Sequence, residues 1–164
     1  MAENTAPGAR RLAPGERATV DRLIYSPVEL HRLMSTQYGT QAARLIAKSP
    51  AARDYLASFA ARPVEVRRAV EVARHCARVM PGGKVGPAYA VTALIMLTLG
   101  RHEEAHTLAD LAVLAAPEDP YALKVHHYSE TVRQAYAKGK GAGEAARQKL
   151  IQTAQRNRTR LTAA

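Results

Sequence analysis

Two segments of this chain carry small side chains at the same helical spacing. Within each segment, three small residues follow one another at steps of four and three, and a proline comes five residues after the last. The two sets are Ala69, Ala73, Cys76 and Pro81, and Ala105, Ala109, Ala112 and Pro117. Steps of four and three keep side chains on one face of an α-helix, and proline ends a helix because it has no N–H to donate. A face of small side chains lets a neighbouring helix approach closely, so the spacing predicts tightly paired helices.

Large ring side chains are scarce in the 164 residues, which contain seven Tyr, one Phe and no Trp. Hydrophobic residues nevertheless make up 47% of the chain and charged residues 23%, which is typical of folded globular proteins rather than of disordered ones. β-Sandwich cores favour aromatic and β-branched residues, whereas alanine favours helices. Composition and spacing together predict an all-α fold.

Helical periodicity recurs along the chain after residue 15, with almost no alternation of period two. The expected helices cover residues 16–25, 27–38, 41–47, 51–61, 63–79, 87–99, 101–115, 120–138 and 143–158. Three boundaries have a clear physical cause, because a capping Ser or Asp precedes a proline that is tolerated in the first helical turn. These boundaries are Ser26-Pro27, Ser49-Pro50 and Asp119-Pro120.

The stretch from residue 89 to residue 117 resembles a tetratricopeptide repeat. That family places an aromatic, a small and a bulky apolar residue on a first helix, a glycine at the turn, and small residues followed by proline on a second helix. The residues at those spacings are Tyr89, Ala93, Met96, Leu99, Gly100, Ala105, Ala109, Ala112 and Pro117. The resemblance implies antiparallel helical hairpins, stacked as a short, degenerate tetratricopeptide-like array with extra N-terminal helices.

A second resemblance covers part of the same stretch. The pattern Gly-Arg-x-x-Glu-Ala, which begins at Gly100, and the later Pro-x-x-Pro, which ends at Pro120, are similar to the helical dimerisation segment of alkyl-sulfatase-type metallo-β-lactamase enzymes. No metallo-β-lactamase domain accompanies the segment here. This resemblance therefore implies only an assembly role, such as a homodimer.

Stacked hairpins of this kind form a groove that binds a peptide or helix of another protein. The resemblance therefore implies a protein-interaction adaptor or chaperone-like module, with no catalytic residue and no cofactor. Groove positions fall on first helices, and beside Ala90 the partner-binding candidates are Leu94, Leu97, Thr98, His126, His127, Glu130, Arg133 and Gln134. The apolar candidates either grip an apolar ligand or are covered by the N-terminal helices or by a second copy of the chain.

Positive charge is concentrated near the C-terminal end. The net charge is +10, and residues 138–164 contribute seven basic side chains against the single acid Glu144. The basic side chains are Lys138, Lys140, Arg147, Lys149, Arg156, Arg158 and Arg160. They favour either a capping helix or an electrostatic contact with nucleic acid or an acidic membrane, and the nucleic-acid contact is the alternative function. We expect a flexible arm at 1–15, a helical core at 16–137, and a basic capping helix at 138–164 beyond a glycine-rich break.

The segment from His102 to His106 matches the pattern His-Glu-x-x-His, which in zinc hydrolases puts two metal ligands one helical turn apart. Here the pattern stands in the first turn after Gly100, and no convincing third ligand follows it. Acidic side chains in a first turn are also favoured by the helix dipole. We therefore expect no metal, and a metal-dependent hydrolase remains a further alternative.

Cys76 is the single cysteine, so no disulfide can form within the chain, which favours a reducing compartment. Its place among small residues indicates a buried thiol rather than a nucleophile. The most apolar window, residues 85–99, falls short of the roughly 20 residues that a membrane-spanning helix needs. Nothing in the first fifteen residues has the apolar core of a signal peptide. We expect a cytoplasmic, bacterial protein without a membrane span.

Overall fold

The computed structural model describes residues 11–80 and 84–163. Within these ranges every regular element is helical, which confirms the predicted all-α class. The α-helices are α1 (Pro14–Tyr25), α2 (Leu30–Met34), α3 (Gln37–Lys48), α4 (Pro50–Ser58), α5 (Val66–Val79), α6 (Gly86–Thr98), α7 (His102–Ala115), α8 (Pro120–Lys138) and α9 (Lys140–Thr162), and a 3-10 helix η1 (Phe59–Ala61) follows α4.

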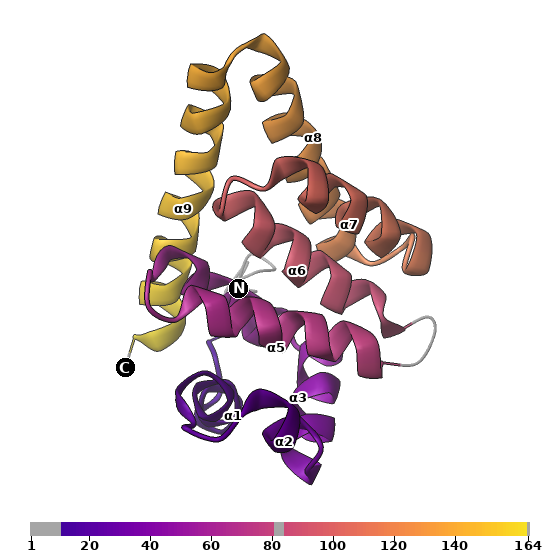
Figure 1. The fold of residues 1–164 in the computed structure, drawn as a ribbon, viewed down its shortest axis with the longest axis vertical. Coiled ribbons are helices and arrows are strands. Elements are labelled where there is room, and N and C mark those ends of the chain that lie inside the picture. Colours follow the sequence, from indigo (N-terminus) through magenta and orange to yellow (C-terminus); the bar gives the residue numbers. More distant parts are fainter. Residues whose placement is uncertain (1–10, 81–83, 164) are drawn as a thin grey trace, which may run out of the picture.

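Helix α6 forms the centre of the core. Every residue of α6 except Tyr89 and Leu94 is buried, as expected for a helix that is apolar all round. It contacts α3, α4, α5, α7, α8 and α9, and α5 and α7 flank it in Figure 1. Among the described residues, no helix is both long and apolar enough to span a membrane.

The small residues that repeat in the sequence lie fully inside. Their fractional exposure is 0% throughout, at Ala69, Ala73 and Cys76 on α5 and at Ala105, Ala109 and Ala112 on α7. Both helices pack on α6, so the two stripes of small side chains belong to the helices that enclose the central one. The closing Pro81 of the first set lies outside the described residues.

The N-terminal third differs in detail from the prediction. The expected helix over 27–38 is wrong, because α2 ends at Met34 and α3 begins at Gln37. Thr36 separates the two helices, since its hydroxyl accepts a hydrogen bond from the backbone N–H of Tyr38 and thereby caps α3. Of the expected N-terminal arm, residues 1–10 lie outside the described residues, and Pro14 already begins α1.

The glycine-rich break before the last helix is much shorter than predicted. Only Gly139 separates α8 from α9, and its φ of 151° is a backbone conformation that favours glycine. Helix α9 then runs back along α8 and packs against α4, α6 and η1 (Figure 1). A Cβ atom on Gly143 would collide with the ring of Tyr136, so glycine there permits the close start of the α8–α9 pair.

Candidate functional site

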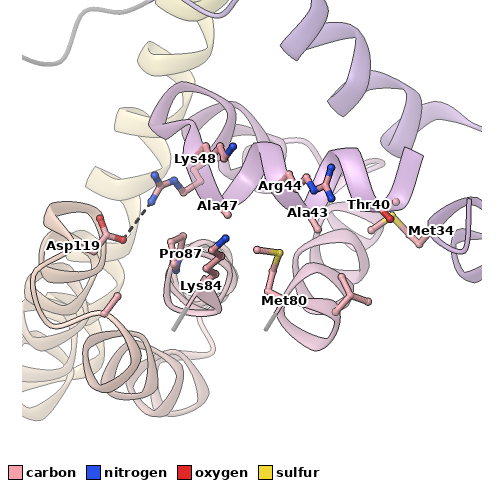
Figure 2. A pocket seen from close by; sticks show the side chains of 14 residues that line it. Met34, Thr40, Ala43, Arg44, Ala47, Lys48, Met80, Lys84, Pro87 and Asp119 are labelled. Carbon is pink, nitrogen blue, oxygen red and sulfur yellow. Dashed lines mark hydrogen bonds and ion pairs between the residues drawn. The ribbon is translucent and has the colours of Figure 1, made fainter. Parts of the chain in front are cut away.

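A cavity of about 610 Å³ opens between the N-terminal helices and the start of α6. In Figure 2, α3 runs along one side and points Ala43 and Ala47 into the space, with Arg44 and Lys48 beside them on the same helix, while Lys84 and Pro87 lie on the opposite side. The lining residues are Met34, Gly39, Thr40, Ala43, Arg44, Ala47, Lys48, Arg53, Val79, Met80, Lys84, Pro87, Ala116 and Asp119. The cavity thus combines aliphatic walls with four cations and one acid.

Three of these cations are not engaged by the protein. Arg44 and Lys48 stand one turn apart on exposed positions of α3, and Lys84 is exposed just before α6. None of these three side chains forms a hydrogen bond or an ion pair with another residue of the described ranges. The cavity wall therefore holds positive charge that the described residues leave without an ion-pair partner.

The fourth cation, Arg53 on α4, is held firmly. Its side chain is only 5% exposed, and Nη1 lies 3.4 Å from Oδ2 of Asp119. Its Nε donates to the backbone carbonyl of Ser49 at 3.4 Å, and its guanidinium stacks over the ring of Tyr121. Asp119 also accepts a hydrogen bond from the N–H of Tyr121, so the pair ties α4 to the start of α8. Asp119, the only acid among the described lining residues, thus already has two hydrogen-bond partners.

The groove candidates on α6 are buried except for Leu94. Ala90 and Leu97 are fully buried, Thr98 is 3% exposed, and Leu94 is half-buried. Leu94 and Thr98 border a small gap of about 30 Å³ whose other walls come from α4, α8 and α9. Of the alternatives left open by the sequence, the structure therefore favours cover by the chain's own helices, with α9 as well as the N-terminal α4 taking part.

The polar candidates on α8 face α7 or solvent. Nε2 of His126 lies 2.9 Å from Oδ1 of Asp110, and Nη1 of Arg133 lies 2.9 Å from Nε2 of His106. Glu130 approaches Nδ1 of the same His106 at 3.4 Å. His127 and Gln134 are exposed. The structure thus brings His126, Glu130 and Arg133 into one network of polar contacts that holds α8 against α7.

The His-Glu-x-x-His pattern does not assemble into a metal site. His102 stacks on the ring of Tyr136 with 4.2 Å between the ring centroids, whereas His106 belongs to the network with Arg133. In the described ranges, no three His, Cys, Asp or Glu side chains are placed to hold a metal ion together. Ser129 reaches within 3.4 Å of His106, but its side chain is fully buried and out of reach of a substrate.

Sequence reasoning missed an exposed apolar edge on α7 and α8. Leu114 is 78% exposed, Leu111 41% and Leu123 47%. The contact between Asp110 and His126 aligns the two helices; Leu114 lies one turn after Asp110, and Leu123 one turn before His126. We call Leu111, Leu114 and Leu123 the leucine edge. Leu111 and Leu114 could have been found, because they fall on the side of α7 opposite its stripe of small residues.

The basic side chains near the C-terminal end divide into two groups. Arg147 donates to the backbone carbonyl of Thr98 at 2.7 Å, and Arg158 lies over the ring of Phe59 and donates to the hydroxyl of Ser58. These two cations are engaged in holding α9 on the core. The remaining nucleic-acid candidates are exposed at Lys138, Lys140, Lys149, Arg156 and Arg160.

Cys76 is enclosed on α5, and burial raises the pKa of its thiol to about 12 because the thiolate would lose its hydration. We predict that Cys76 in the native protein stays unreactive toward DTNB at about pH 8 and reacts fully in denaturant. The measurement is the absorbance of released thionitrobenzoate. Full reaction of the native protein within the mixing time would show that α5 opens readily or that the thiol is accessible.

Comparison of the chain with protein-family models, with curated proteins and with solved structures gives no significant match.

Proposed function

We propose that this chain is a protein-interaction module that docks a partner protein on the outer face of α7 and α8. The observation that carries the proposal is the leucine edge, with Leu114 78% exposed. Exposed apolar side chains rimmed by polar residues are typical of protein-binding surfaces. Polar residues that are exposed or half-buried follow Leu123 along α8, and they are the residues that the tetratricopeptide resemblance implied for partner binding: His126, His127, Glu130, Arg133 and Gln134.

The network between α7 and α8 supports docking because it holds the surface in one shape. The pairs of His126 with Asp110 and of Arg133 with His106 fix the two helices against each other before a partner arrives. A preformed surface loses less conformational entropy on binding. Complete burial of a leucine side chain stabilises a complex by about 1.5–3 kcal/mol. Three partly exposed leucines can therefore form the apolar centre of a protein-binding interface.

The tetratricopeptide-like arrangement is part of this proposal, with α6 and α7 as the two helices of one repeat. Its support is the fully buried stripe of small residues on α7 and the packing of α7 on α6. In such an array the module acts by holding another protein, not by converting a substrate.

Photocrosslinking tests the docking surface. A photoreactive residue in place of the exposed Thr107 on α7 should give a discrete crosslinked product in cells, and the same residue at Val64, 88% exposed between η1 and α5, should not. Adding Leu114→Lys or Leu123→Glu should abolish the product without changing the melting temperature, because both side chains are exposed. Each new charge also suits its helix end, since Leu114 lies near the end of α7 and Leu123 near the start of α8.

Two outcomes would contradict the proposal: identical products from positions 107 and 64, or a product that persists after both leucine substitutions. The mass of the crosslinked product identifies the partner class. If the partner is a second copy of the chain, sedimentation should show a dimer that Leu114→Lys converts to a monomer, which is the assembly role implied by the dimerisation-segment resemblance.

A further inference from the structure

Positive charge gathers at the cavity of Figure 2 without a matching number of acids among the described residues. Arg44 and Lys48 stand at i and i+4 on α3, where like charges repel each other, and Lys84 adds a third cation to the same space. Asp119, the single acid that the described part of the chain places there, already pairs with Arg53 and caps the start of α8. A cavity with apolar walls strengthens such a field and draws in counter-charge. A bound anion would therefore balance the excess positive charge at the cavity.

Arg53 supplies a donor that is already oriented. The carbonyl of Ser49 and the carboxylate of Asp119 fix Nε and Nη1, and the ring of Tyr121 covers the guanidinium. Nη2 has no hydrogen-bond partner among the residues that the structure describes. A buried, immobilised guanidinium binds a carboxylate or phosphate with little loss of side-chain entropy.

The remaining lining residues indicate which chemical group carries the anion. Aliphatic side chains dominate it, from Met34, Ala43, Ala47, Met80, Pro87 and Ala116. Among the described residues that line the cavity there is no aromatic ring, so a nucleobase or other flat ring would find nothing there to stack on. Two methionines adapt their shape to a flexible chain. The volume of about 610 Å³ lies within the roughly 300–1,000 Å³ that small-molecule sites span.

We propose that this cavity binds a small amphiphilic anion, in which a carboxylate or phosphate head group is carried on an aliphatic chain. The head group lies at the end of the cavity lined by Lys48, Arg53 and Lys84, and the chain lies along the methionines and alanines toward Arg44. This activity is distinct from partner docking because the cavity and the leucine edge have no residue in common. The cavity opens between α3, α4 and α6 and reaches the α7–α8 connection only at Ala116 and Asp119.

Calorimetry with the full chain tests the chemistry of the ligand, using octanoate, octyl phosphate, octan-1-ol and inorganic phosphate as probes below any micelle concentration. We expect at least one of the two amphiphilic anions to bind with one site per chain. Octan-1-ol and inorganic phosphate should each bind at least about tenfold more weakly, because octan-1-ol lacks the anionic head group and inorganic phosphate lacks the aliphatic chain. The tighter of the two anions identifies the head group.

Charge-matched variants test the location. Lys48→Gln combined with Lys84→Gln should weaken binding of the amphiphilic anion at least about tenfold. Lys138→Gln combined with Lys149→Gln removes the same charge from exposed positions near and on α9 and should leave the affinity unchanged. All four side chains are exposed, so both variants should melt like the wild type, which separates lost binding from lost folding.

The proposal is overturned if neither octanoate nor octyl phosphate saturates a single site. It is equally overturned if octan-1-ol binds as tightly as the anions, since the cavity would then be only an apolar recess. Equal loss of affinity in the two charge-matched variants would show non-specific attraction to a basic protein. A tight complex with inorganic phosphate would show that the aliphatic wall takes no part.

Discussion

Replacement of Ala109 by arginine should unfold the protein or lower its free energy of unfolding by about 3–5 kcal/mol, the cost of an uncompensated buried charge. Ala109 is the middle member of the stripe on α7, and its side chain is fully buried, as are those of Ala105 and Ala112. The stripe allows α7 to lie close to α6, so a long side chain has no room there. The guanidinium would also lack a hydrogen-bond partner.

Thermal melting followed by circular dichroism measures the effect, and Thr107→Arg is the matched control. Thr107 lies two residues earlier on the same helix and is exposed, so the control adds the same charge to a solvated position and should melt like the wild type. If both variants melt together near the wild-type temperature, Ala109 is not enclosed and the register of the buried stripe is wrong.

Local signals in the sequence predicted some of the helices accurately. The helix over 120–138 was predicted with the boundaries that the structure shows, because Asp119 caps its first turn, Pro120 occupies that turn, and Gly139 ends it. The buried stripes on α5 and α7 were predicted because steps of three and four are visible without tertiary information. In both cases the cause of the structure lies within one helix.

The start of α9 could not be predicted in this way. Gly141 and Gly143 lower the helix propensity, so the sequence indicated a break up to residue 143. Packing overrides that preference, since the ring of Tyr136 occupies the place where a side chain on residue 143 would stand. Gly143, which the sequence indicated as a helix breaker, is the residue that allows the start of α9 to pack closely against the end of α8.

The cavity could not be predicted from the sequence either, because it depends on which helices pack together. Its cations come from positions as far apart as Arg44 and Lys84, and its acid from Asp119. Periodicity assigns each residue to a face of its own helix but does not say which helices meet. The groove candidates Leu97 and Thr98 show the converse: the sequence marked them as one apolar face, and the structure covers that face with its own helices.

Truncation of the chain after Ala137 should lower the stability of the core and promote aggregation, because α9 covers apolar residues from several helices. Arg158 lies 4.3 Å from the ring centroid of Phe59 and 5.1 Å from that of Tyr55, and Leu161 is buried near the end of α9. Arg147 satisfies the backbone carbonyl of Thr98 at the end of α6. Removing α9 uncovers Tyr55, Phe59 and the Thr98 carbonyl and deletes the buried Leu161, at a cost of more than about 3 kcal/mol by the usual value of buried apolar side chains.

The double substitution Lys149→Ala and Arg156→Ala separates this packing role from the charge of α9. Both side chains are exposed, so the full-length variant should retain the wild-type melting temperature while it loses two cations. Thermal melting and static light scattering on the truncated chain, the variant and the wild type provide the comparison. A truncated chain that stays monomeric and melts like the wild type would defeat the capping role. The basic segment would then be an independent tail whose cations do not stabilise the fold. That result would favour the alternative function, in which these cations bind nucleic acid.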